Sequence, residues 1–117
     1  MNEGIKQGIK EFMMVGKLAE AKGLLISAAD NYFKALIHAI NFSLFDKIGK
    51  IPDSHTERFR ILERENKKLY KLVDSLFNLY RKSYRNSITK DEFKEIKDGL
   101  KKTLEITNLE KEFAQYL

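Results

Sequence analysis

The sequence predicts an all-α domain, an up-and-down antiparallel bundle of four to five helices. Apolar residues recur at intervals of three and four along most of the chain, which indicates helices with one buried face. No stretch alternates apolar and polar residues over strand length between turn signals. The connections are short, as is typical of antiparallel neighbours, and a chain of 117 residues fits a single domain spanning residues 1–117.

The first two predicted helices differ in how much of their surface is apolar. The first has one apolar face, and Gly23 is expected to end it: Ile5, Ile9, Phe12, Met13, Gly16 and Ala19. The second runs from about Ile26 to Ile48 and carries two apolar stripes: Ile26, Ala29, Phe33, Leu36, Ile37, Ile40 and Leu44, then Ala28, Tyr32, Ala35, Ala39 and Phe42. A helix that is apolar on most sides is expected at the centre of the bundle.

The later helices are marked by their first residues. Gly49 and Pro52 end the second helix, and Ser54-His55-Thr56-Glu57 is a capping box that predicts the start of a third. Whether that helix continues through residues 65–67 stays open. The apolar pattern returns from Leu69 to Tyr80, and a second capping box at residues 89–92 predicts a helix with Phe93, Ile96, Leu100 and Leu104 inward. Asn108 is expected to cap a short closing helix.

The composition excludes several classes of function. The chain has no cysteine, so it has no disulfide, thiolate zinc site or cysteine nucleophile. Its first residues lack the apolar run of a signal peptide, and polar residues interrupt the apolar stretch at residues 24–44, so we expect a soluble, cytoplasmic protein. No metal-ligand spacing, phosphate loop or catalytic serine motif occurs, and no metal or cofactor is expected. The net charge of +5 is compatible with nucleic acid or an acidic partner.

A basic cluster with interleaved tyrosines is the main candidate site for phosphate, RNA or a protein partner. Its members are Tyr80, Arg81, Lys82, Tyr84, Arg85, Asn86 and Lys90. Arginine forks and aromatic faces suit phosphates and unstacked bases. The alternative is a solvated helix end, where cations favour the negative end of the helix dipole and Asn86 adopts a left-handed turn.

The two histidines have weaker claims to a functional role. His38 lies on an apolar helix, where a hydrogen-bonded structural imidazole is the expected alternative to a proton carrier or ligand. His55 lies in the first turn of a helix, where the dipole disfavours a cationic imidazole. We expect the His38 side chain to be structural and the His55 side chain to be structural or exposed.

The stretch from Gly23 to Leu62 resembles the HEPN superfamily of small helical bundles. The likeness starts with the aromatic pair Tyr32-Phe33 and the following Lys34-Ala35-Leu36-Ile37-His38-Ala39, and continues with Ser54-His55 before a helix bearing Phe59 and Leu62. Residues 79–86, Leu-Tyr-Arg-Lys-Ser-Tyr-Arg-Asn, resemble the family's late Leu-Tyr-Arg segment, and the likeness covers roughly residues 5–107.

The resemblance implies a fold of four or five helices, often a two-fold dimer, and frequent pairing with a nucleotidyltransferase. Many members are ribonucleases of toxin–antitoxin, phage-defence or RNA-processing systems, whose motif is an arginine, a polar neighbour and then a histidine. Here Arg85-Asn86 supplies the first two residues, but no histidine follows, because His55 is the last in the chain. Without that proton carrier we expect ribonuclease activity to be absent.

Three hypotheses for function follow from the sequence. The first is a non-catalytic HEPN-like interaction module, acting as a homodimer or with a nucleotidyltransferase-type partner, in which Arg81, Arg85 and Asn86 bind phosphate or a carboxylate. The second is an RNA-binding protein or a ribonuclease with a rearranged site, and the third a structural helical protein. Exposed apolar residues would favour the first, and Phe42, Phe45 and Tyr116 are the candidates.

Overall fold

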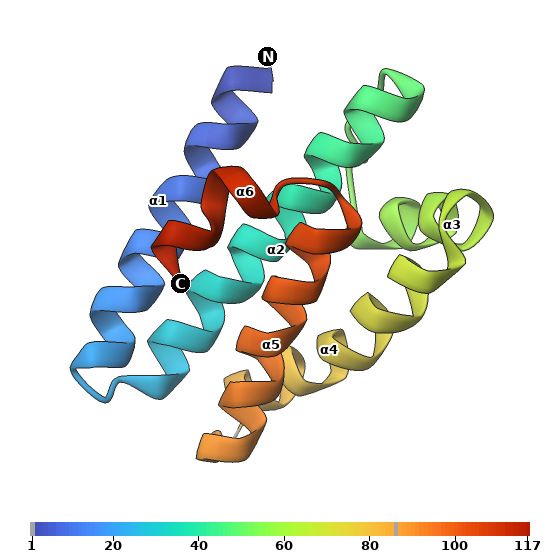
Figure 1. The fold of residues 1–117 in the computed structure, drawn as a ribbon. Coiled ribbons are helices and arrows are strands. Elements are labelled where there is room, and N and C mark those ends of the chain that lie inside the picture. The colour runs from blue at the N-terminus through green and yellow to red at the C-terminus, as the bar shows by residue number, and fades with distance from the viewer. Residues whose placement is uncertain (1, 86) are drawn as a thin grey trace.

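The structure is a computed structural model that describes residues 2–85 and 87–117, with side chains for residues 3–83 and 87–117. Figure 1 shows an all-helical arrangement in which five long helices precede a short C-terminal one. The elements are α1 (Asn2–Ala21), α2 (Leu25–Ile48), α3 (His55–Glu65), α4 (Lys67–Arg85), α5 (Lys90–Ile106), α6 (Glu110–Phe113) and the 3₁₀ turn η1 (Ala114–Tyr116). The predicted all-α class is thereby confirmed, and no strand occurs in the described residues.

The helices α1 and α2 form an antiparallel hairpin that turns at Gly23 (Figure 1). Gly23 has a φ of +74°, which favours glycine, and it ends α1 as the sequence predicts. The Leu24 amide donates to the Ala19 carbonyl at 2.9 Å, which satisfies one of the carbonyls left free at the helix end. The predicted inner face of α1 is buried apart from Phe12, which is half-buried.

The central helix of the fold is α2, which packs against α1, α4 and α5. Ten of its residues are buried: Ala28, Ala29, Tyr32, Phe33, Ala35, Leu36, Ile37, Ala39, Ile40 and Leu44. This confirms the prediction from its two apolar stripes, except that Phe42 is only half-buried and Ile26 is exposed. Ile26 is 50% exposed, because it lies in the first turn of α2, beyond the part of the helix that its neighbours cover.

The connection between α3 and α4, left open by the sequence, is a break at Asn66. Asn66 has φ −155° and ψ 85°, and its side chain accepts a hydrogen bond from the Leu69 amide at 3.1 Å, so it caps α4. At the other end of α3, Ser54 accepts from the Glu57 amide as predicted. The Glu57 carboxylate, however, accepts from the Asp53 amide and not from the Ser54 amide, so only half of the predicted capping box forms.

The second capping box is complete, since Thr89 and Glu92 each accept from the other's backbone amide. The four apolar residues predicted to point inward from α5 are all buried. The prediction for Asn108 is wrong: it has a φ of +62° and ends α5, and Leu109 precedes α6 without a side-chain cap. Asn108 tolerates this left-handed conformation better than most residues do.

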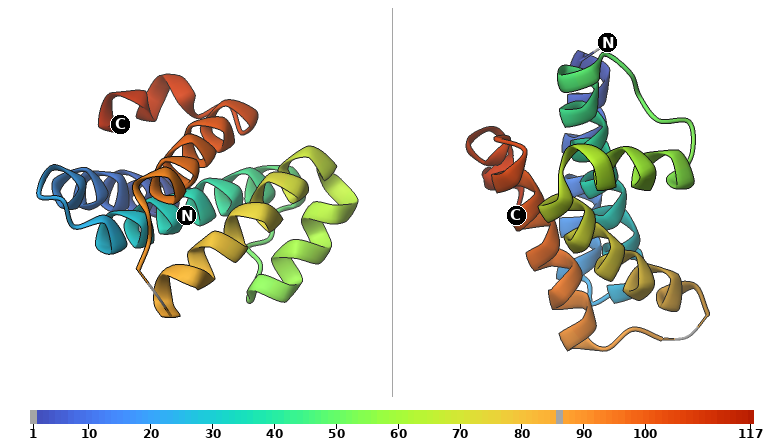
Figure 2. Two further views of the ribbon diagram at one scale, coloured as in Figure 1. Left: turned by 90° about the horizontal axis from the view of Figure 1, so that it is seen from below. Right: turned by 90° about the vertical axis from the view of Figure 1, so that its right-hand side faces the viewer.

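The C-terminal segment folds back against α1 (Figures 1 and 2). Lys6 forms an ion pair with Glu112 at 2.9 Å, and Lys10 lies 5.9 Å from the centroid of the Tyr116 ring. Tyr116 is therefore half-buried, as are Phe42 and Phe45, so the expectation that these three would be exposed is wrong. Figure 2 also shows α3 beside α4, the helix against which it packs.

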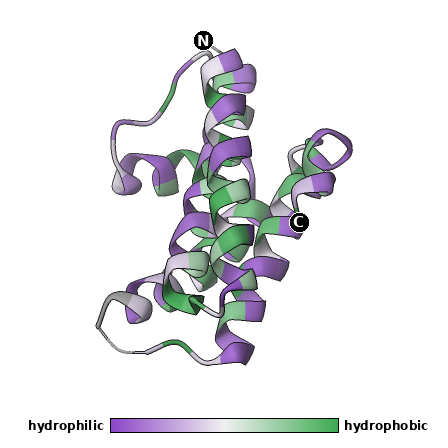
Figure 3. Cartoon of the chain, turned by 90° about the vertical axis from the view of Figure 1, so that its left-hand side faces the viewer, coloured by the Kyte–Doolittle hydropathy of each residue, from purple (hydrophilic) through white to green (hydrophobic). Residues whose placement is uncertain are grey.

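Apolar and polar segments alternate along the helices (Figure 3), as the amphipathic pattern of the sequence predicts. Among the residues that the structure describes, no helix has both the length and the apolar character that a membrane crossing requires.

Candidate functional site

The predicted basic cluster lies where α4 ends and α5 begins. Arg81 is exposed, with its guanidinium carbon 5.9 Å from the centroid of the Phe77 ring. Lys82 is ion-paired with Glu92 across the two helices, so its charge is balanced, and Lys90 is the first residue of α5 and exposed. The side chains of Tyr84 and Arg85, and all of Asn86, lie outside the described residues.

The two histidines, His38 and His55, line one cavity, which we call the Arg58 pocket. It has a volume of about 330 Å³ and lies between α2, α3 and the loop before α3, with Tyr80 of α4 at its edge. Its lining residues are Phe33, Lys34, Ile37, His38, Asn41, Asp53, Ser54, His55, Arg58 and Tyr80. Nothing in the sequence associates His38 with His55; they meet because α3 packs against α4 and contacts α2 through the Arg58–Asn41 hydrogen bond.

Arg58 is the most unusual residue of this pocket, because it is a charged side chain that is only 7% exposed. Its Nε donates to the Asn41 side-chain oxygen at 2.9 Å, and its Nη1 lies 3.0 Å from Nδ1 of His55. Both partners are neutral acceptors. Within the described part of the chain, no carboxylate forms an ion pair with Arg58, and its Nη2 makes no hydrogen bond. Burial lowers the pKa of Arg58 from its usual value.

The same contact favours the neutral form of His55. Arginine can only donate, so Nδ1 of His55 must accept and the ring proton resides on Nε2. Partial burial, together with the charge of Arg58, lowers the pKa of His55. The ring centroid also lies 5.1 Å from that of Phe77. Apart from these contacts the His55 side chain is exposed.

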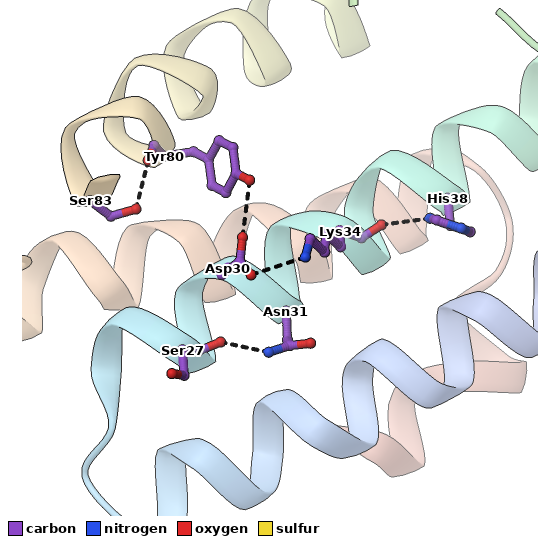
Figure 4. Close-up of polar contacts among 7 residues, drawn as sticks. All are labelled: Ser27, Asp30, Asn31, Lys34, His38, Tyr80 and Ser83. Carbon is purple, nitrogen blue, oxygen red and sulfur yellow. Dashed lines mark hydrogen bonds and ion pairs between the residues drawn. The ribbon is translucent and has the colours of Figure 1, made fainter. Parts of the chain in front are cut away.

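The rim of the pocket is ordered by a chain of polar contacts between α2 and α4 (Figure 4). The Tyr80 hydroxyl donates to Asp30 at 3.0 Å, and Lys34 forms an ion pair with the other oxygen of Asp30 at 3.1 Å. Nδ1 of His38 lies 3.0 Å from the Lys34 carbonyl. Tyr80 stacks on Phe33 with ring centroids 4.2 Å apart, so this wall of the pocket is aromatic.

A second cavity follows one face of α5 and is lined by four lysines. Its volume is about 530 Å³, and the lysines are Lys90, Lys94, Lys97 and Lys101. The other lining residues are Glu20, Gly23, Leu25, Phe93 and Asp98. Lys97 donates to both oxygens of Glu20 at 2.9 and 3.0 Å. Burial alone would raise the pKa of Glu20, but the hydrogen bonds from Lys97 and Tyr32 outweigh it and lower the pKa.

Five exposed apolar side chains lie on α1, in the turn that follows it and in the first turn of α2; we call this set the α1 stripe. The fractional exposures of its side chains are 45% for Met14, 49% for Val15, 64% for Leu18, 54% for Leu24 and 50% for Ile26. The partly buried aromatic residues expected in this role contribute nothing to it.

Of the Arg58 pocket, the lysine-lined cavity and the α1 stripe, only the lysine-lined cavity has a signal in the sequence. The lysines of α5 are spaced i, i+4, i+7 and i+11, which predicts one helix face. The burial of Arg58 has no such signal, because it results from tertiary packing alone. Among the described residues, no three histidine or carboxylate side chains converge as a metal site would require.

Comparison with protein-family models, with curated proteins and with solved structures finds no match to this chain. The fold and these three surfaces define a small helical-bundle protein with candidate binding sites, and its function must be inferred from them.

Proposed function

We propose that this chain is a non-catalytic, HEPN-like helical interaction module that self-associates as a homodimer through the α1 stripe. The observation that carries the proposal is the run of exposed apolar side chains at Met14, Val15 and Leu18. Exposed apolar residues that form a contiguous set, and not single scattered ones, are typical of association surfaces. The resemblance to a family of up-and-down bundles that often form two-fold dimers supports the same function.

The charges that flank the stripe favour a second copy of the chain as the partner. Glu11, Val15 and Leu18 of α1 and Lys22, in the turn directly after it, are spaced i, i+4, i+7 and i+11, and all four are exposed. In an antiparallel pair of α1 helices centred between Val15 and Leu18, Val15 of each copy faces Leu18 of the other. Glu11 of each copy then faces Lys22 of the other. Such a self-complementary face is what a two-fold interface requires.

The test is the oligomeric state of charge variants, measured by sedimentation equilibrium. The wild type should dimerise with increasing concentration, and Leu18→Glu should be monomeric. Glu11→Lys should weaken the dimer, because the lysine introduced at position 11 would face Lys22 of the other copy. The exchange variant Glu11→Lys/Lys22→Glu should restore it. A wild type that stays monomeric at millimolar concentration, or an exchange variant as weak as Glu11→Lys, would contradict the proposal.

The sequence also leads us to propose a nucleotidyltransferase-type protein as a further partner, contacted through Arg81, Arg85 and Asn86. Arg81 is exposed and therefore accessible to a carboxylate or phosphate on such a partner. Titration of a purified nucleotidyltransferase of this class with the wild type and with Arg81→Ala/Arg85→Ala tests the assignment. Equal affinity for both proteins would remove these residues from the interface.

RNA binding is the second candidate function, and the lysine face of α5 favours it. Lys90, Lys94 and Lys101 are exposed along one edge of the larger cavity. Lysines arranged in this way bind phosphates with an affinity that falls steeply with salt. Lys94→Gln/Lys101→Gln should then weaken binding of single-stranded RNA at low salt, compared with Lys67→Gln/Lys68→Gln, which removes the same charge from the start of α4. RNA cleavage that disappears in Arg85→Ala would instead indicate a ribonuclease with a rearranged site.

A further inference from the structure

We propose that the Arg58 pocket binds a phosphate group, held by the Arg58 guanidinium and the first turn of α3. This site is separate from the α1 stripe and from the basic cluster at the end of α4, and it does not depend on self-association.

The first reason is that Arg58 forms no ion pair within the described residues, although the charge of Glu57, which is ion-paired with Lys50, acts on it at longer range. A buried ion normally has an opposite charge beside it, because removing a charge from water is costly. Arg58 is 7% exposed, yet within the described residues its side chain hydrogen-bonds only to the neutral acceptors Asn41 and His55. Its Nη2 has no protein acceptor there. An oxyanion in the pocket would supply both the missing charge and the missing acceptor.

The second reason is the orientation of α3. Its first residue, His55, and its cap, Ser54, both line the pocket, so the positive end of the helix dipole lies at the pocket. The first amides of a helix have no partner within it. The Glu57 amide is taken by Ser54, which leaves those of His55 and Thr56 for a ligand. Amides at a helix start together with an arginine fork form a common phosphate-binding arrangement.

The charges and walls of the pocket define the ligand further. The charged side chains that line it are Lys34, Arg58 and Asp53, and Asp30 lies beside Lys34. These two positive and two negative charges balance, and of the two cations only the Arg58 guanidinium lacks an ion pair within the described residues, which suits one phosphate group rather than a polyanion. A volume of about 330 Å³ admits more than inorganic phosphate, and the wall formed by Phe33 and Tyr80 is aromatic. The ligand is therefore either inorganic phosphate or the phosphate of a phosphomonoester.

The first experiment is an NMR titration of the wild type with sodium phosphate and, separately, with phenyl phosphate, against sodium chloride of equal ionic strength. Both phosphates should shift the amides of residues 54–58 and the imidazole of His55 in a saturable way, and chloride should not. Tighter binding of phenyl phosphate would assign a phosphomonoester, and equal binding would assign inorganic phosphate. Shifts confined to the lysines of α5, or the same shifts with chloride, would overturn the proposal.

The second experiment compares two arginines of α3. Arg58→Gln removes the pocket charge, whereas Arg60→Gln removes the same charge from an exposed position of the same helix. Arg58→Gln should weaken phosphate binding by about tenfold or more, the usual worth of a charge-assisted hydrogen bond, and Arg60→Gln should change it less than about twofold. Equal effects of the two substitutions would show that only net charge matters. If Arg58→Gln does not fold, the wild-type titration decides alone.

Discussion

The contact between Gly16 of α1 and Tyr32 of α2 gives the sharpest test of the packing. A Cβ atom at Gly16 would lie 2.7 Å from two carbon atoms of the Tyr32 ring. Ordinary carbon contacts are about 3.5–4.0 Å, so Gly16→Ala forces an overlap of about 1 Å. Tyr32 has little room to retreat, because it is fully buried and its hydroxyl donates to Glu20 at 2.8 Å.

Two terms with opposite signs determine the effect of Gly16→Ala on stability. Overpacking a filled core costs about 1–3 kcal/mol. Alanine in a helix gains up to about 1 kcal/mol over glycine. Gly4→Ala is the matched control, because it makes the same change in the same helix with nothing within 4 Å of the added Cβ. The helix term is shared, so Gly16→Ala should be less stable than Gly4→Ala by about 1–3 kcal/mol.

Urea unfolding followed by circular dichroism measures this difference in the free energy of unfolding. The double variant Gly16→Ala/Tyr32→Leu should lose less stability than the sum of its two single variants, because the smaller side chain relieves the overlap. The reasoning is refuted if Gly16→Ala is as stable as Gly4→Ala, or if the double variant is strictly additive.

Three further predictions concern caps, protonation and a buried hydroxyl. Thr89→Ala should lower the free energy of unfolding by about 1 kcal/mol in urea titrations, because it removes the complete cap of α5. His55→Asn should flatten the pH dependence of the free energy of unfolding between pH 5 and 7, measured in the same way. Burial and the charge of Arg58 lower the folded-state pKa of His55, so protonation below its unfolded-state pKa favours the unfolded chain. The wild type should therefore lose stability as the pH decreases through this range. Tyr32→Phe should cost about 1.5–3 kcal/mol at pH 7, because it removes a hydrogen bond to the ionised Glu20, and less at pH 3 in the same urea titration.

Local sequence signals predicted the elements of this fold and most of their boundaries. The glycines at positions 23 and 49 have φ values of +74° and +73° and end α1 and α2, as expected. The capping box of α5 forms completely, because Thr89 and Glu92 are three residues apart, which is the spacing that a capping box requires. The cap of α3 formed by half, because Lys50 forms an ion pair with Glu57 at 2.6 Å and competes for the orientation of its carboxylate.

Features that depend on how the helices pack could not be predicted from the sequence. Phe42 and Tyr116 were expected to be exposed, because nothing in the sequence says that Lys6 lies over the Phe42 ring or that the C-terminal segment folds back onto α1. Arg58 was not singled out for the same reason. Its neighbour Arg60 has the same chemistry and is exposed, and only the position of α3 against α2 distinguishes them.

The helix α1 also reaches the proposed phosphate site through Gly8, which leads to a final prediction. A Cβ atom at Gly8 would lie 2.6 Å from Cδ2 of His38, a residue that lines the Arg58 pocket. His38 is half-buried and its ring packs edge-on against Phe12 at 5.0 Å, so its free direction is away from α1. Gly8→Ala should therefore push the imidazole toward the pocket.

The consequence should appear in two measurements. The ring resonances of His38 should shift in Gly8→Ala and not in Gly4→Ala, and phosphate should bind more weakly to Gly8→Ala because the pocket is narrower. Dimerisation should be unchanged, since Gly8 is on the inner face of α1 and the stripe at Met14, Val15 and Leu18 is on the outer one. If phosphate binding is unchanged although the His38 resonances move, then His38 borders the pocket without limiting it, and the first turn of α3 with Arg58 determines the affinity alone.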